Sequence, residues 1–319
     1  MGDLFQNKRV IMNNILFIGG AGFIGSSLIK RLVKEDNISI CVLEPPAANL
    51  SRIEGLNVKV FRDTLANTER IEEIIKICEI NCIVHLVSTL IPGSGYEDFK
   101  DEVQKVVFPT MCLSQLCSKL GVKLIFFSSG GTVYGNRNIS IPFAEDEERS
   151  PISYYGLTKL MIENNILFEH RTQGLEYLIL RPSNPYGYGQ SLNGKQGFIA
   201  VALGKVLQGE TIEIWGDGSS IRDYIYICDL CEIFIRILQS NIVDTTLNIG
   251  SGNGYSINKI LEIIEKCTSQ KVSVTYTPAR SQDVSTMILS TKKLKSFIDF
   301  EITPLEVGIK SFYNDIKNL

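Results

Sequence analysis

The segment Ile15-Leu-Phe-Ile-Gly19-Gly-Ala-Gly22-Phe-Ile-Gly25 decides the fold of this chain. An apolar run leads into three glycines with the spacing GxxGxxG, and a segment of helical period follows. Glycine permits a tight turn and lets the backbone approach a pyrophosphate, whose charge would then lie at the positive end of the helix. The segment therefore predicts a phosphate-binding turn; the simpler interpretation is a strand–helix corner that binds nothing.

An acidic residue follows this turn at the distance that a dinucleotide site requires. The apolar run at 38–43 ends at Glu44, roughly twenty residues after Gly25. A carboxylate there accepts hydrogen bonds from the adenosine ribose hydroxyls and repels a 2′-phosphate, so it predicts NAD(H), with NADP(H) as the alternative. The simpler interpretation is that Glu44 is a solvated turn residue. The predicted dinucleotide-binding set also includes Phe23, Ile24, Leu86 and, near the adenine, Asp63.

Apolar blocks alternate with segments of helical period over the first half of the chain. The blocks lie at 15–18, 38–43, 58–61, 82–87, 124–127 and 177–180. Nearly continuous apolar strands separated by helices are typical of a parallel sheet that is covered on both faces. The pattern predicts an α/β fold, a Rossmann-type doubly wound parallel sheet.

The second half of the chain has a different character. Beyond Asn184 the alternation weakens and turn signals become frequent, as in Tyr186-Gly-Tyr-Gly and Gly216-Asp-Gly218. We expect a leader at 1–13, a dinucleotide-binding domain at 14–183 and a smaller C-terminal α/β lobe for the substrate at 184–319. Chain crossings back to the sheet would join the two parts.

Composition excludes several classes of partner. The chain has 319 residues, 44% of them hydrophobic, and 32 Lys and Arg against 35 Asp and Glu give a net charge of -3. This balance lacks the basic stripe that nucleic acids or anionic membranes require. No apolar run approaches the roughly 20 residues of a membrane span, and Met1–Met12 is too short and polar for a secretory signal. We expect a cytoplasmic protein.

The cysteines and histidines do not predict a metal site. Eight cysteines lie mostly inside apolar runs and should remain reduced thiols. Cys228-Asp-Leu-Cys231 is the only CxxC, and a closed zinc site would need two further ligands. Two thiols facing a helix core are the favoured interpretation. His85 and His170 stand without a partner motif, so structural roles are expected for both.

A tyrosine and a lysine supply the catalytic pattern. Tyr155-Gly-Leu-Thr-Lys159 begins a segment of helical period, and a spacing of four residues places both side chains on one face. A phenol is a poor base at neutral pH, but a nearby ammonium and the positive nicotinamide ring would lower its pKa and make it a proton shuttle. Ser129, at the end of the fifth strand, could hydrogen-bond the same substrate oxygen. Together the three residues predict a catalytic site.

With these motifs the chain resembles the extended short-chain dehydrogenase/reductases, which include nucleotide-sugar epimerases, dehydratases and reductases. The resemblance covers almost the whole chain and adds Leu180-Arg-Pro-Ser-Asn184-Pro-Tyr-Gly and Gly216-Asp-Gly-Ser-Ser-Ile-Arg222-Asp-Tyr. It implies that Asn184 contacts the diphosphate of a nucleotide sugar and that Arg222 neutralises it. It also implies that Arg280 and Asp283 bind substrate, although such a pair is also typical of a surface ion pair.

Three features depart from the family pattern. Dehydratases of this group carry an Asp-Glu pair where this chain has Gly130 and Gly131, which argues against dehydration. The double glycine leaves either Ser129 or Thr132 as the third catalytic group; we favour Ser129 because it ends a strand. The stretch from Ser88 to Thr110, expected beside the nicotinamide, replaces the small residues and the Asn-Val-x-Gly-Thr sequence usual in epimerases.

Two enzymatic hypotheses share hydride transfer at carbon 4 of a nucleotide-activated hexose. A reductase would act on dTDP-4-dehydro-6-deoxyglucose in the synthesis of bacterial surface polysaccharide such as O-antigen, and the departures at 88–110 favour it slightly. An epimerase would hold NAD tightly and interconvert UDP-glucose or UDP-N-acetylglucosamine with the epimeric sugar. The third hypothesis is a dinucleotide-sensing protein without catalysis. The apolar helices expected near 103–120 and 157–168 would also allow a homodimer.

Overall fold

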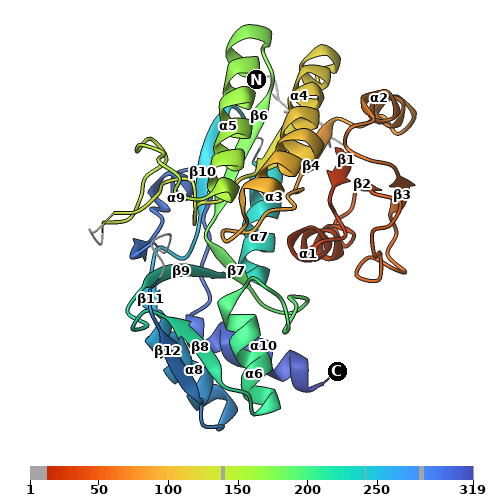
Figure 1. Ribbon diagram of the computed structural model, residues 1–319. Helices are drawn as coiled ribbons and strands as arrows, with labels where there is room; N and C mark the ends of the chain where they lie inside the picture. The colour runs from red at the N-terminus through yellow and green to blue at the C-terminus, as the bar shows by residue number, and fades with distance from the viewer. Residues whose placement is uncertain (1–12, 138–140, 241, 280–283, 319) are drawn as a thin grey trace, which may run out of the picture.

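The computed structural model describes residues 13–137, 141–240, 242–279 and 284–318, and over these ranges it contains a seven-stranded parallel sheet (Figure 1). Its strand order is β10-β6-β5-β4-β1-β2-β3. From β1 the chain adds strands first on one side, to β3, and then from β4 onward on the other side, so the switch point of the sheet lies between β1 and β4. The strands are β1 (Asn13–Ile18), β2 (Ile38–Glu44), β3 (Lys59–Arg62), β4 (Cys82–His85), β5 (Lys123–Phe127), β6 (Tyr177–Pro182) and β10 (Thr245–Ile249). The predicted doubly wound α/β fold is confirmed.

Helices cover both faces of this sheet because side chains along each strand alternate between the faces. Phe17 of β1 packs into one apolar cluster, and its neighbours Leu16 and Ile18 pack into the other. The Phe17 side is covered by α1 (Phe23–Leu32) and α7 (Ile227–Gln239). The opposite side is covered by α2 (Thr68–Ile77), α4 (Phe108–Leu120) and α5 (Tyr154–Gln173), of which α4 and α5 lie side by side in Figure 1.

A short helical segment precedes α4. Helix α3 (Tyr96–Glu102) continues into a π-helical turn, η1 (Val103–Val107), and then directly into α4. A π turn holds an extra residue relative to an α-helix, and such turns occur frequently at functional sites. The stretch from Ser88 to Thr110, which departs from the family pattern, is therefore irregular in structure as well.

The lower half of Figure 1 is built around β9, which pairs with β7 and β13 in parallel and with β11 antiparallel. A separate parallel pair joins β12 to β8. The elements are β7 (Asn184–Tyr186), α6 (Phe198–Gln208), β8 (Ile212–Trp215), β9 (Ile221–Tyr226), β11 (Gly254–Ser256), α8 (Ile257–Thr268), β12 (Val274–Thr277), β13 (Thr286–Met287) and α10 (Leu305–Lys317). The short helix α9 (Lys292–Lys295) lies beside β10 of the large sheet (Figure 1).

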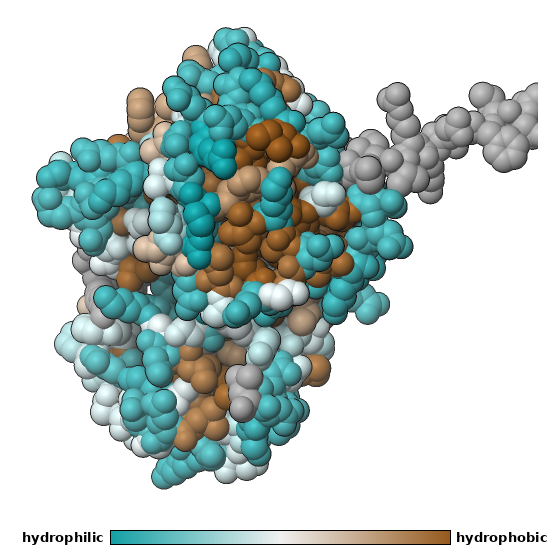
Figure 2. All heavy atoms as spheres, turned by 90° about the vertical axis from the view of Figure 1, so that its right-hand side faces the viewer, coloured by the Kyte–Doolittle hydropathy of each residue, from teal (hydrophilic) through white to brown (hydrophobic). Residues whose placement is uncertain are grey.

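The two halves share one apolar core. Leu203 of α6, Ile264 of α8 and Phe312 of α10 belong to the same buried cluster as the residues beneath α1 and α7. The chain also returns from the lower half to the large sheet as β10. Figure 2 shows a mostly hydrophilic face, with apolar side chains gathered in the middle of its upper half. The boundary at residue 184 stays a prediction, because the shared core does not itself mark a division.

The isolated cysteines and histidines have structural surroundings. Cys231 is buried in α7, but Cys228 is exposed, so the expectation that both thiols face the helix core is wrong for Cys228. Buried His85 has Nε2 2.9 Å from Thr110 Oγ1, and His170 donates from Nδ1 to the Leu175 carbonyl oxygen at 2.9 Å. Within the described ranges, no three His, Cys, Asp or Glu side chains are grouped to hold a metal ion. No helix there is long and apolar enough to cross a membrane.

Candidate active site

The glycine turn has no room for side chains at two of its positions. Gly19 has a φ of +83°, and a Cβ added to it would lie 2.9 Å from Val87 Cγ2. At Gly25 an added Cβ would lie 2.7 Å from the Gly20 backbone, because α1 packs directly onto the turn. Gly22 caps α1 without a side-chain hydrogen bond. The first N–H groups of the helix are therefore available to an anion such as a pyrophosphate.

Glu44 is buried beside this turn and is not a solvated residue. Its Oε1 accepts a hydrogen bond of 2.6 Å from the backbone N–H of Ala21. Burial raises the pKa of the Glu44 carboxyl, and the Ala21 hydrogen bond and the charge of Arg62 oppose that rise. The acid at the end of β2 is thus fixed against the turn at the end of β1.

The other predicted dinucleotide contacts surround this corner. Phe23 and Ile24 line the cavity between the glycine turn and Tyr155, which is called the central cavity below. Leu86 donates its backbone N–H to the Ile18 carbonyl oxygen at 3.0 Å. Asp63 stabilises its own loop, because its carboxylate accepts hydrogen bonds from Thr64 N and Asn67 Nδ2. The contact between Asp63 and an adenine stays a prediction.

The structure brings Ser129, Tyr155 and Lys159 together at the end of β5. Helix α5 starts at Tyr154, with Ser153 accepting a 3.1 Å hydrogen bond from Gly156 N as its N-cap. The Ser129 hydroxyl lies close enough to the Tyr155 phenol to lower its pKa. Lys159 Nζ lies 5.8 Å from the centre of the Tyr155 ring and donates to the Phe127 carbonyl oxygen at 3.0 Å. The chain thus presents a phenol, a hydroxyl and an amine around one point.

Burial dominates the ionisation of this group. It raises the pKa of Tyr155 to about 12, and the charge of Glu102 raises it further, whereas the hydrogen bond from Ser129 lowers it. Burial lowers the pKa of Lys159 to about 8, against the opposing charges of Glu102 and Glu163. Burial therefore outweighs the other effects on the Tyr155 pKa in the protein alone, and its lowering by Lys159 together with the nicotinamide ring stays a prediction. Tyr155 is a neutral phenol and Lys159 mostly an ammonium at pH 7.

A cavity of about 540 Å³ joins the glycine turn, the Tyr155 group and the lower half of the molecule. Thr132 Oγ1 and Ser183 Oγ are buried there and have no hydrogen-bond partner among the described residues. Buried hydroxyls without partners are costly unless a ligand or water satisfies them. The space beside the glycine turn and these two hydroxyls fit a bound dinucleotide.

Predicted substrate residues line the same cavity from the other side. Asn184 donates from Nδ2 to the Asp223 carbonyl oxygen at 2.7 Å, which fixes its orientation. Arg222 also lines the cavity and donates from Nη1 to the Ile221 carbonyl oxygen at 2.9 Å. Arg280 and Asp283 lie outside the described residues. Asn184 and Arg222 are therefore placed for a substrate that reaches across to Tyr155.

Three charged residues near the cavity were not singled out from the sequence. Lys195 lines its rim, and Glu102 is buried at the end of α3. Arg181 forms a buried ion pair with Glu163 at 2.7 Å, and Glu163 also accepts from the Ser128 hydroxyl at 2.5 Å. Arg181 belongs to the motif at residues 180–187, but Glu102 and Lys195 belong to no motif.

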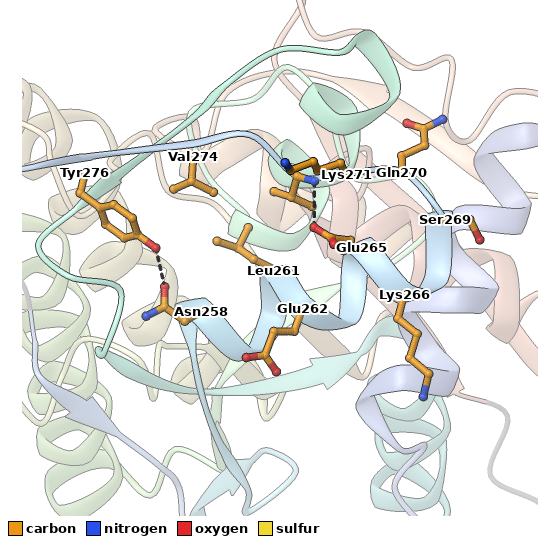
Figure 3. Close-up of a pocket in the computed structure, with 11 residues that line it drawn as sticks. Asn258, Leu261, Glu262, Glu265, Lys266, Ser269, Gln270, Lys271, Val274 and Tyr276 are labelled. Atoms are coloured by element: carbon orange, nitrogen blue, oxygen red, sulfur yellow. Dashed lines mark hydrogen bonds between the residues drawn. The ribbon is translucent and has the colours of Figure 1, made fainter.

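A second hollow, of about 800 Å³, lies far from this chemistry between α8 and β12 (Figure 3). Tyr276 donates its hydroxyl to Asn258 Oδ1 at 3.2 Å, and Val272 N donates to Glu265 Oε2 at 3.0 Å. The hollow contains none of the predicted site residues. The polar groups of these two pairs hydrogen-bond each other. The central cavity, which contains the predicted residues, is therefore the candidate active site.

The sheet order, the glycine turn and the Ser-Tyr-Lys group define a dinucleotide-dependent enzyme of the short-chain dehydrogenase/reductase type. Residues 15–250 match the family model described as the NAD dependent epimerase/dehydratase family. The chain belongs to this family, and its cofactor is NAD.

A reductase and a putative epimerase each resemble the chain over nearly its full length. The Escherichia coli dTDP-4-dehydro-6-deoxyglucose reductase is 32% identical, with 96% of this chain and 98% of that protein covered. A putative UDP-glucose 4-epimerase of Methanocaldococcus jannaschii is 31% identical, with 95% and 98% covered. The structure of a Thermotoga maritima UDP-glucose 4-epimerase with UDP-glucose matches with a TM-score of 0.89 at 28% identity, covering 96% of this chain and 99% of that one. The chain is therefore a nucleotide-sugar enzyme of the epimerase or reductase kind.

Proposed function

We propose that this protein reduces a 4-keto nucleotide sugar, with dTDP-4-dehydro-6-deoxyglucose as the best candidate and bacterial surface polysaccharide, such as O-antigen, as the destination of the product. The observation that carries the proposal is the buried Tyr155 phenol beside Ser129, with Lys159 Nζ 5.8 Å from the centre of its ring. Burial raises the pKa of Tyr155 and so favours its neutral form. Reduction of a ketone begins with this acid form of the tyrosine. The likeness to the Escherichia coli reductase supports the same substrate.

The chain's own residues have defined tasks in this reaction. The glycine turn and Glu44 would hold NAD, which in its reduced form would supply the hydride for carbon 4 of the sugar. Tyr155 donates its proton to the carbonyl oxygen as that oxygen gains charge, which leaves an alcohol. Ser129 hydrogen-bonds the same oxygen, and the Lys159 ammonium stabilises the phenolate until solvent returns a proton. Asn184 and Arg222, with Arg280 and Asp283, would hold the diphosphate and sugar.

A 4-epimerase is the second candidate. It is favoured by the likeness to the Thermotoga maritima enzyme, whose structure contains UDP-glucose. In an epimerase reaction of this chain, Tyr155 would first take the proton from the sugar hydroxyl and later return it. Dehydration is disfavoured, because a Cβ at Gly130 would lie 2.5 Å from Leu289 Cδ1 and 2.9 Å from the Arg181 carbonyl oxygen. An acidic side chain cannot enter that position without displacing the backbone.

The assembly and location are finer points of the proposal. Phe108 of α4 and Phe168 of α5 are exposed apolar side chains, and pairing of these helices with a second copy would cover them. A homodimer is therefore proposed, and light scattering of the purified protein tests it. The cytoplasm stays the predicted location.

Assays of the purified protein with UDP- and dTDP-sugars separate the candidates. A reductase oxidises NADH only when a 4-keto sugar nucleotide is present. An epimerase retains NAD through purification and interconverts UDP-sugars without added cofactor. Dinucleotide binding with no turnover of any sugar nucleotide would contradict both and favour the sensing hypothesis.

A further inference from the structure

Glu102 is a buried carboxylate that the proposed reaction does not yet use. It is the last residue of α3 and only 1% exposed. Its Oε1 accepts from the Ser88 hydroxyl at 2.8 Å, and its Oε2 accepts from the Thr89 backbone N–H at 2.9 Å and the Thr89 hydroxyl at 2.5 Å. Three short hydrogen bonds thus hold the loop between β4 and α3 to one side chain.

This loop connects the two ends of the active site. Val87, directly before the bonded pair, packs against Gly19 of the glycine turn. Residues 91–93, which follow it after Leu90, line the central cavity. The hydrogen bonds of Glu102 therefore fix two of the three residues between Val87 and residue 91. A change at Glu102 should reach the cavity through this loop.

The charge of Glu102 acts on Lys159. The amine is surrounded by the Phe127 carbonyl oxygen, the Phe126 ring at 4.9 Å and the Tyr155 ring. Two acids favour its ammonium form, Glu102 and Glu163.

Only one of these two acids is neutralised by arginines among the described residues. Glu163 pairs with Arg181 at 2.7 Å and with Arg149 at 3.2 Å. The hydrogen bonds that Glu102 accepts all come from neutral groups. His85, whose protonation the Lys159 charge opposes, has its pKa lowered to about 3 by burial and is neutral. Both acids therefore act on the lysine, and Glu102 is the one whose hydrogen bonds among the described residues come only from neutral groups.

We propose that Glu102 is a positioning residue that fastens the loop at Ser88 and Thr89 beside the active site and holds there a negative charge that acts on Lys159. Because this role serves Lys159, it rests on the proposed function. Ser88, Thr89 and Glu102 form one hydrogen-bonded unit within the stretch that departs from the family pattern.

The titration of Lys159 tests the charge directly and needs no substrate. Protein with carbon-13 at lysine Cε is titrated by NMR, and the Lys159 signal is identified by its loss in Lys159→Met. In the unaltered protein the midpoint should lie near the pKa of about 8. Glu102→Gln should lower it by about one pH unit, because a nearby negative charge is lost. Glu97→Gln removes an exposed charge from the same helix and should leave the midpoint unchanged. Equal midpoints in the Glu102→Gln and unaltered proteins would overturn the proposal.

A second pair of changes tests the fastening of the loop. Ser88→Ala/Thr89→Val keeps the carboxylate but removes two of its hydrogen bonds. Turnover should fall about tenfold, as expected for about 1.4 kcal/mol of lost positioning, while the Lys159 midpoint does not fall. Unchanged turnover would remove the loop from the proposal.

Further measurements separate the role of Glu102 from a folding defect and from a failure of the proposed function. If Glu102→Gln does not fold, Glu102→Asp retains the charge and should keep the Lys159 midpoint; a fall of about one unit there would contradict the proposal. In the folded Glu102→Gln variant, the alkaline limb of the turnover profile should move to lower pH together with the midpoint. If the unaltered protein turns over no sugar nucleotide, the proposed function fails, and the NMR comparison still decides the effect of Glu102 on Lys159.

Discussion

The Glu44 carboxylate accepts a 2.6 Å hydrogen bond from the backbone N–H of Ala21, which joins the end of β2 to the glycine turn after β1. A buried carboxylate at this point should repel the 2′-phosphate of NADP(H). We predict that Glu44→Gln reduces the preference for NADH over NADPH by about tenfold, equivalent to about 1.4 kcal/mol. Fluorescence titrations with the two dinucleotides measure this ratio.

An exposed acid nearby provides the control for Glu44. Glu54 follows β2 in the sequence and is exposed. Glu54→Gln should leave the ratio of the two dissociation constants unchanged. A preference that survives in Glu44→Gln would mean that Glu44 does not select the cofactor.

The glycines of the turn should differ in their tolerance of a methyl group. An added Cβ at Gly25 would lie 2.7 Å from the Gly20 backbone, whereas at Gly22 the nearest atom is the Gly19 carbonyl oxygen at 3.5 Å. Gly25→Ala should lower the free energy of unfolding by about 1–3 kcal/mol through overpacking. Gly22→Ala should change it by less than about 1 kcal/mol. Urea unfolding measures both, and equal losses would contradict the close packing at Gly25.

We expect Lys159 to lower the free energy of unfolding while it supports turnover. Its pKa is lowered from 10.5 to about 8, so its buried charge costs about 3 kcal/mol at pH 7. Lys159→Met removes that cost but leaves the Phe127 carbonyl oxygen unpaired, at about 1–2 kcal/mol. The variant should therefore be more stable at pH 7 by about 1–2 kcal/mol and should lose turnover.

The pH dependence of this gain has a defined sign. Between about pH 8 and pH 10.5 the folded protein holds fewer protons on Lys159 than the unfolded chain does, so its stability rises with pH. Lys159→Met lacks this dependence, and its advantage should shrink over the same window. Denaturant unfolding at several pH values measures it, and an advantage that grows with pH would be inconsistent with a buried ammonium.

Arg222 is expected to bind substrate without taking part in proton transfer. Arg222→Gln should raise the KM for the sugar nucleotide by at least about tenfold, because a charged bidentate contact to the diphosphate is lost, with little change in kcat. Dinucleotide affinity should not change. Arg236→Gln, on the exposed side of α7, is the matched control. A fall in kcat alone would place Arg222 in a different role.

The sequence predicted those parts of the site that are set by local spacing. The turn at Gly19–Gly25, the acid at Glu44 and the pair Tyr155/Lys159 each follow from residue spacing along one element or between neighbouring strands. The parallel sheet followed from the alternation of apolar blocks with helices.

What the sequence could not predict depends on packing between distant elements. Glu102 meets Ser88 and Thr89 only because α3 folds back over the end of β4, and no motif marks it. The burial that raises the Tyr155 pKa was not predicted, because spacing reveals a neighbouring lysine but not how deeply the phenol is buried.

Tyr155→Phe tests the central claim most directly, since it removes one hydroxyl from the centre of the site. Turnover of the sugar nucleotide that the unaltered protein accepts should fall by at least about a hundredfold, as expected for loss of a general acid. The NADH dissociation constant, measured by fluorescence on the same samples, should change by less than about threefold, within about 0.7 kcal/mol. Turnover equal to that of the unaltered protein, with NADH still bound, would contradict the account.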